Sequence, residues 1–185
     1  SINDLNIVKM LDMQRNSNNY KLVHTTTQIN KKTNEKSIIE VVHYYKDGKH
    51  KEIVSVERNG KMEIETIKFI EDDMYGKTTV FPSLKQIDHQ TQDYIEELKG
   101  NYLNKIIGLV MLNDAGVGRL GLKTRTEMFN DKECYVVSDV YSGSYRENYI
   151  DKETGDLVRV VSGSENYYTE ELFTLTENVV TDEDV

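Results

Sequence analysis

"SIIEVVHYYKDGKHKEIVSVERNGKMEIETIKFI", residues 37–70, contains three runs rich in β-branched and aromatic residues, separated by Asp47-Gly48 and Asn59-Gly60. Asp-Gly and Asn-Gly between such runs are the strongest short-range signals for a β-hairpin, because these residues accept the positive φ angles of a two-residue turn. The stretch therefore predicts three antiparallel strands joined by two tight hairpins.

The same alternation continues on both sides of this stretch. Before it, "YKLVHTTTQI" at 20–29 is rich in β-branched residues, and after it "MYGKTTVF" at 74–81 predicts a further strand that Pro82 ends. Parallel strands need crossover helices, and these runs lie too close together to contain them. The sequence therefore predicts an antiparallel meander over residues 20–81.

The last third of the chain repeats this pattern. Five short alternating runs follow one another and predict a second meander over residues 117–178. The runs are "GLKTRTEMF" at 121–129, "ECYVVSDVY" at 133–141, "YRENYI" at 145–150, "LVRVVSG" at 157–163 and "YYTEELFTLTENV" at 167–179.

Two other segments have helical spacing. Apolar residues three apart predict an N-terminal helix at 2–14, and the spacing in "YIEELKGNYLNKIIGLVML" predicts a helical insert at 83–112. The predicted fold class is α+β, mainly antiparallel β. It comprises a strongly curved sheet or half-open barrel, with an N-terminal helix and a helical insert, in a single domain spanning residues 1–185.

Composition excludes several classes of function. The net charge is −9, so a nucleic-acid partner, which needs a basic surface, is not expected. No run approaches the roughly 20 apolar residues that span a bilayer as a helix. The single cysteine, Cys134, lies in an apolar strand-like run and is predicted to be a buried small hydrophobe rather than a nucleophile.

Motifs for catalysis are absent from the sequence. It contains no G-x-S-x-G, C-x-x-C or H-E-x-x-H pattern, so no catalytic residue and no cofactor are predicted. One group of potential metal ligands remains. A two-residue turn at Asp47-Gly48 pairs Lys46 with Lys49, Tyr45 with His50, and His43 with Glu52.

This pairing places His43, His50 and Glu52 on one face of the sheet. Two imidazoles and a carboxylate can bind a divalent metal, but the ligand types alone make no motif. The favoured interpretation is a polar rim at the hairpin tip, on a face that becomes dry towards Ile39 and Val56. No metal site is predicted, and these three residues are its only candidates.

Two local questions stay open at this point. A two-residue turn at Asn59-Gly60 puts Glu63 and Glu65 on the face of Val54 and Val56, unless a β-bulge shifts the register by one residue. The second question concerns "DKETGD", residues 151–156, whose acids could bind calcium. The EF-hand pattern is absent, and Thr154-Gly155 suits a tight turn, so a hairpin corner is favoured there.

The late hairpin and the ending of the chain resemble a known family. "YIDKETGDLVRVV", residues 149–161, is similar to the late hairpin of LolA-like cell-envelope lipoproteins. The predicted order of helix, meander, helical insert and second meander resembles the plan of the same family. The ending "FTLTENVVTDEDV", residues 173–185, resembles its clostridial members, the GerS-like germination lipoproteins of spores.

The resemblance implies a half-open barrel that is not an enzyme. It implies a location in the cell envelope or spore, with membrane attachment through a lipid anchor that this chain does not contain. GerS-like members assist an amidase that modifies cortex peptidoglycan, so the implied protein partner is an N-acetylmuramoyl-alanine amidase. LolA-like members hold acyl chains or a partner segment on an apolar concave face, so a lipid or lipoprotein carrier is the alternative.

The candidate binding residues are apolar positions of the first meander and of the predicted insert. Free strand edges also predict a homodimer formed by strand pairing or swapping. The candidate partner- or ligand-binding residues are Ile39, Val41, Tyr45, Val54, Val56, Ile106 and Val110.

Overall fold

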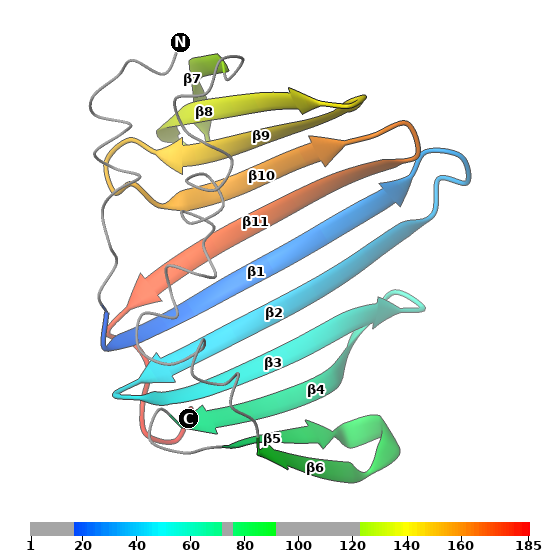
Figure 1. Cartoon of the computed structure of the whole chain (residues 1–185). Coiled ribbons are helices and arrows are strands. Elements are labelled where there is room, and N and C mark those ends of the chain that lie inside the picture. Colours follow the sequence, from blue (N-terminus) through cyan, green and yellow to red (C-terminus); the bar gives the residue numbers. More distant parts are fainter. Residues whose placement is uncertain (1–16, 72–75, 92–122) are drawn as a thin grey trace. The chain divides into compact units, whose positions relative to one another are not determined.

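The described part of the chain consists of antiparallel strands, most of which are joined by short turns (Figure 1). The computed structural model describes residues 17–71, 76–91 and 123–185. These form two units, which are considered separately. The β1–β6 unit contains described residues 17–26, 37–71, 76–91 and 174–185, and the β7–β11 unit contains described residues 27–36 and 123–173.

In the β1–β6 unit the strands lie side by side in the order of the sequence. This arrangement confirms the antiparallel meander predicted for residues 20–81. The strands are β1 (Asn19–Asn30), β2 (Lys36–Lys46), β3 (Lys49–Arg58), β4 (Lys61–Glu71), β5 (Gly76–Phe81) and β6 (Gln86–Thr91).

Both predicted tight turns are present. Asp47 and Gly48 have φ angles of 47° and 86°, and Asn59 and Gly60 have φ angles of 53° and 78°. Two successive positive φ angles define a type I′ turn, whose twist matches that of the strands it joins. The register of the first hairpin follows from this turn, and Lys46 pairs with Lys49 as predicted.

A β-bulge settles the register of the second hairpin. Val56 pairs with Glu63, as an unbroken register requires, but the pairing shifts between Val54 and Ser55. Beyond the shift Val54 pairs with Thr66, and Glu65 is the extra residue of β4. The bulge thus brings Thr66 to the face where an unbroken register would place Glu65.

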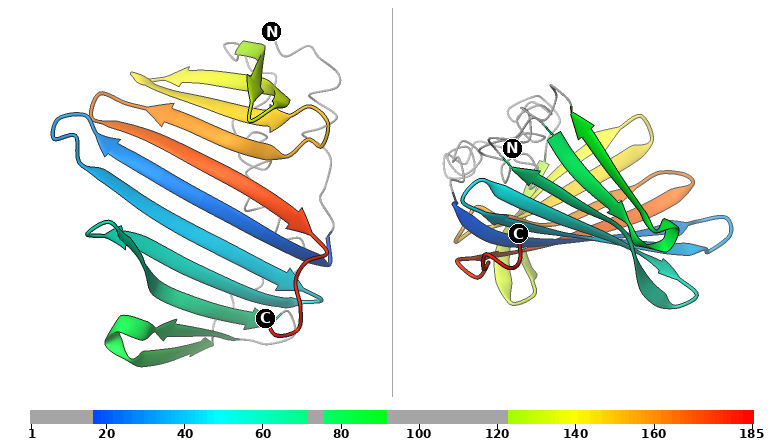
Figure 2. Two further views of the ribbon diagram at one scale, coloured as in Figure 1. Left: turned by 180° about the vertical axis from the view of Figure 1, so that it is seen from behind. Right: turned by 90° about the horizontal axis from the view of Figure 1, so that it is seen from below.

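The β7–β11 unit confirms the second meander. Its strands pair in the order β11-β10-β9-β8-β7, and Figure 2 shows them from two further sides. The register of β9 and β10 shifts between Leu157 and Arg159, which makes Val158 a second bulge. The strands are β7 (Lys123–Phe129), β8 (Lys132–Tyr141), β9 (Ser144–Asp151), β10 (Leu157–Gly163) and β11 (Tyr167–Glu177).

The predicted α+β class is wrong, because the described residues are almost entirely antiparallel strand. Their only helical element is a single 3-10 turn, η1 (Pro82–Leu84), and the start of the predicted insert forms strand β6 instead. Lys85 follows η1 in the left-handed conformation, with φ of 52°, and reverses the chain so that β6 pairs with β5. The predicted helix at 2–14 and residues 92–112 of the insert lie outside the described residues.

Each unit has its own buried side chains. In the β1–β6 unit they include Tyr20, Leu22 and Ile70. In the β7–β11 unit Cys134 and Val136 are fully buried and belong to one apolar cluster. Cys134 is thus buried as predicted, and burial raises the pKa of its thiol.

Gly163 in β10 leaves room for an aromatic ring. It pairs with Tyr145, and a Cβ atom added at Gly163 would overlap the ring of that tyrosine. We expect Gly163→Ala to destabilise the protein by about 1–3 kcal/mol, because the ring of Tyr145 must move out of a packed position. In a Tyr145→Ala background the same change is expected to be neutral or stabilising, since alanine suits a strand better than glycine. Urea unfolding of the four proteins measures this, and an equal cost in both backgrounds would refute it.

Candidate functional site

Eight side chains of the first hairpin share one face of the sheet, here called the β2–β3 face. The predicted register is confirmed, because Ile39 pairs with Val56, Val41 with Val54, His43 with Glu52, and Tyr45 with His50. Side chains alternate between the two faces of a strand, so all eight point to the same side. Five of the seven predicted binding residues are thereby brought together, whereas Ile106 and Val110 lie outside the described residues.

The distribution of burial on this face is the reverse of the prediction. The hairpin tip is buried, with His43 only 7% exposed, whereas Ile39 at the other end is 41% exposed. Tyr20 of β1 explains the difference, because its ring packs 5.2 Å from that of Tyr45. The Tyr45 ring in turn lies 4.5 Å from that of His50. The predicted wet rim is therefore an aromatic cluster, and the aliphatic end is the part that solvent reaches.

Burial keeps the imidazole of His43 uncharged. It lowers the pKa of His43 from 6.5 to about 3, with further contributions from His24, His50 and Lys68. The carboxylate of Glu52 favours the charged form, since its Oε2 lies 3.8 Å from His43 Nδ1, but burial outweighs it. Glu52 Oε1 also lies 3.6 Å from Lys68 Nζ. Near pH 7 the buried end of the face therefore presents a neutral histidine.

The potential metal ligands share a face without forming a ligand set. No three His, Cys, Asp or Glu side chains in residues 17–71, 76–91 and 123–185 are placed to hold a metal ion. A cavity of about 10 Å³ lies among Tyr20, His43, His50 and Glu52. That volume corresponds to roughly one water molecule, so a larger ligand would have to contact the exposed end of the face.

The acidic stretch at 151–156 is a turn, as predicted. Asp151 N donates to Asp156 O at 2.8 Å, and Gly155, with φ of 76°, closes the corner. Two ion pairs connect this turn with β8. Lys132 lies 3.5 Å from Asp151, and Lys152 lies 2.8 Å from Glu133.

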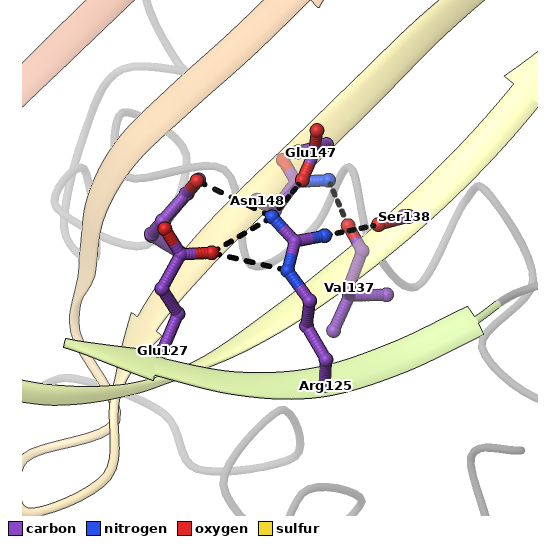
Figure 3. A network of polar contacts seen from close by, with 7 residues as sticks. Arg125, Glu127, Val137, Ser138, Glu147 and Asn148 are labelled. Carbon is purple, nitrogen blue, oxygen red and sulfur yellow. Dashed lines mark hydrogen bonds and ion pairs between the residues drawn. The ribbon is translucent and has the colours of Figure 1, made fainter. Parts of the chain in front are cut away.

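A second group of polar side chains, which was not predicted, lies on the β7–β11 unit. Arg125 donates to Glu127 through Nε at 3.0 Å and Nη2 at 2.9 Å, and it also contacts Glu147 and Ser138 (Figure 3). Arg159 lies over the rings of Phe129 and Tyr149 and bonds to Glu170.

Cross-strand pairing assembles this group. Arg125, Val136, Tyr149 and Arg159 follow one another across β7 to β10. Each guanidinium is paired with carboxylates, so the arrangement is that of a structural ion-pair network rather than a reactive site. Arg159 stands between two valines in β10, which is a sequence signal for a charged side chain on a strand, whereas Arg125 stands between two threonines and gives no such signal.

Comparisons with known proteins give distant structural similarities only. No family model and no curated protein matches the chain. A LolA superfamily protein from Nitrosomonas europaea has a TM-score of 0.40 at 7% identity, with 96% of this chain and 94% of that chain covered. A structure from Vibrio parahaemolyticus, described as an outer membrane lipoprotein-sorting protein domain, has a TM-score of 0.38 at 10% identity, with 96% and 94% covered. Neither similarity assigns a family or a function to this chain.

The part of the chain that the structure describes contains no helix of the length and hydropathy needed to cross a bilayer.

Proposed function

We propose that this chain is a non-catalytic binding domain of the cell envelope. In this proposal the exposed aliphatic end of the β2–β3 face holds an apolar segment of a protein partner. One observation carries the proposal. Ile39, Val41, Val54 and Val56 form two cross-strand pairs that stay partly exposed beside a buried end whose histidine, His43, is uncharged.

An aliphatic strip of this kind favours apolar ligands. Burial of apolar surface contributes about 25 cal/mol for each Å² removed from water. These four aliphatic side chains have no polar groups, so their burial breaks no hydrogen bond to water. A few well-packed residues at the centre of an interface commonly supply most of its affinity. The expected ligand therefore presents apolar side chains and no charge opposite Ile39 and Val41.

The resemblance of the late hairpin and of the chain's ending supports a more specific partner. GerS-like lipoproteins assist a cortex amidase, so the partner proposed here is an N-acetylmuramoyl-alanine amidase that modifies cortex peptidoglycan during spore germination. The face would stabilise or position the amidase and would take no part in its chemistry.

A second candidate is a lipid or lipoprotein carrier. The purely aliphatic character of the exposed strip favours it, since an acyl chain needs no hydrogen-bond partner. The cavity at the buried end of the face, at about 10 Å³, is far too small for an acyl chain. On this face an acyl chain would therefore have to lie along the exposed strip.

Two matched isoleucine variants test the proposal. Ile39 is 41% exposed on the β2–β3 face, and Ile64 is 45% exposed and pairs with Ser55 on the opposite face. We expect Ile39→Glu to weaken binding of the purified amidase by about tenfold or more, because a carboxylate would be buried in the interface. Ile64→Glu is expected to leave the affinity unchanged.

Titration of each variant with the amidase by calorimetry gives the affinities, and circular dichroism checks that both variants remain folded. Extraction of each variant with organic solvent, followed by mass spectrometry, tests the carrier alternative. Equal affinities of the two variants for the amidase would show that the β2–β3 face is not the binding surface. If the unmodified chain retains a phospholipid and the Ile39→Glu variant does not, the ligand of the β2–β3 face is an acyl chain and not the amidase.

A further inference from the structure

The segment that follows β11, residues 178–185, is held on the β1–β6 unit through Asn19. The amide of Asn19 donates to Val180 O at 2.9 Å and accepts from Val180 N at 2.9 Å. Asn178 N donates to Asn19 O at 3.0 Å, and the side chain of Val180 is buried. Asn19 thus binds the backbone of the segment as a neighbouring strand would, while Val180 supplies an apolar anchor.

The acids of the segment face lysines. Asp182 Oδ1 lies 2.6 Å from Lys46 Nζ, and this hydrogen bond, with a contribution from the charge of Lys49, lowers the pKa of Asp182. Asp184 Oδ2 accepts from Thr181 N at 2.7 Å and from Thr181 Oγ1 at 3.0 Å. These bonds lower the pKa of Asp184, and the charges of Lys51 and Lys21 add to the effect.

The lysines form a group, here called the lysine patch, that consists of Lys21, Lys46, Lys49 and Lys51 around Tyr44. Lys21 Nζ and Lys51 Nζ each lie 5.5 Å from the centre of the Tyr44 ring. Lys46 pairs directly with Lys49, and like charges at paired positions repel each other. Glu71 opposes Lys49 from β4. In a chain of net charge −9, this patch attracts anions locally.

We propose that Asn19 and the lysine patch form a docking site for an acidic peptide segment of a partner protein. In the structure, residues 178–185 of the chain itself occupy this site, and the partner segment displaces them when it binds. The contacts define the pattern that the site recognises: an apolar residue, followed two positions later by an acid, as in Val180 and Asp182. Tyr44 and Lys46 alternate with Tyr45 along β2, so the site lies on the opposite face from the β2–β3 face and is independent of the function proposed above.

The resident segment is suited to replacement. The side chain of Asp182 is 92% exposed, and exposed ion pairs contribute little to stability. Figures 1 and 2 show the segment, in red, turning back from the end of β11 past the turn between β2 and β3. Because the segment is tethered, its effective concentration at the site is on the order of millimolar, so it competes with any partner in solution. Release of the segment should therefore expose the site.

A peptide with the sequence of residues 178–185, Asn-Val-Val-Thr-Asp-Glu-Asp-Val, serves as the probe. The full chain carrying both Asp182→Lys and Asp184→Lys serves as the released chain. The two new lysines repel the lysine patch, and this repulsion releases the resident segment. We expect this variant to bind the labelled peptide about tenfold more tightly than the unmodified chain, because its intramolecular competitor is gone. A peptide with asparagine at both aspartate positions is expected to bind to neither protein. Fluorescence anisotropy at low salt measures each affinity.

Further variants of the released chain locate the peptide. Lys46→Glu is expected to abolish binding, whereas Lys61→Glu, which changes an exposed lysine on β4 outside the lysine patch, is expected to preserve it. Circular dichroism excludes loss of fold as the cause. Equal peptide affinities for the released and unmodified chains would overturn the proposal. So would a dimer of the unmodified chain that dissociates on Asp182→Lys, since the occupant would then be the segment of a second copy.

Discussion

Protonation of His43 is expected to lower the free energy of unfolding strongly when the pH is lowered from 7 to 3. The folded-state pKa of His43 is about 3, against 6.5 for the free side chain. Between these values the unfolded chain binds a proton that the folded chain excludes, so stability falls as the pH falls. The contribution of the neutral imidazole is complete above pH 6.5 and is lost progressively down to pH 3. Its upper limit is roughly 5 kcal/mol.

The His43→Gln variant isolates this contribution, because glutamine can occupy a similar volume without taking up a proton. Urea unfolding between pH 3 and pH 7.5 should show a shallower decline for this variant than for the unmodified chain. His89→Gln is the matched control, since His89 is exposed on β6, and its curve should follow that of the unmodified chain. Parallel curves for all three proteins would show that His43 is protonated equally in the folded and unfolded states.

Leu22→Ala is expected to cost about 2–5 kcal/mol of unfolding free energy, the range for a fully buried leucine. Leu22 is completely buried in β1, beside the aromatic cluster at the hairpin tip. The lost methyl groups leave a cavity among strands that cannot close over it without breaking their pairing. Leu84→Ala removes the same atoms from an exposed position in η1, and should change stability by less than about 0.5 kcal/mol.

Chemical unfolding at pH 7 compares the two leucine variants with the unmodified chain. The slope with denaturant should stay constant, so that the shift in midpoint reports stability alone. Similar midpoints for Leu22→Ala and Leu84→Ala would mean that the face of β1 carrying Tyr20 and Leu22 is not packed as described. The Leu22→Ala result thus tests the burial on which the neutral state of His43 also depends.

The hairpins of the first meander could be predicted because their turns depend on two residues. Asp47-Gly48 and Asn59-Gly60 accept positive φ angles that other pairs resist, and a two-residue turn sets the register of the adjoining strands. The bulge at Glu65 could not be predicted, because the local pattern is compatible with either register. Its position becomes fixed only when Thr66 and Ile70 align with β3.

Strand β6 was missed for a different reason. Ile87 is the only strongly apolar residue of β6, so the segment has too little hydrophobic alternation to predict a strand. It forms a strand because η1 and the left-handed Lys85 direct the chain back along β5. The deciding interactions are therefore backbone pairings, which a pattern of side chains does not reveal.

The common face of the first hairpin was predicted, but the burial along this face was not. Alternation places His43, His50 and Ile39 on one face, and this was correct. What covers that face depends on Tyr20 and Ile70, which belong to other strands. The network around Arg125 and Arg159 has the same origin, because the register of strands β7 to β11 brings Glu147 and Glu170 to the arginines.

A photoreactive amino acid at position 39 tests the central claim most directly. We expect ultraviolet irradiation of the producing cells to cross-link the protein through position 39 to an amidase, identified by mass spectrometry of the adduct. The same residue at position 64, equally exposed on the opposite face, should give no such adduct. Amidase adducts formed equally from both positions, or from position 64 alone, would contradict the assignment of the aliphatic strip as the binding surface.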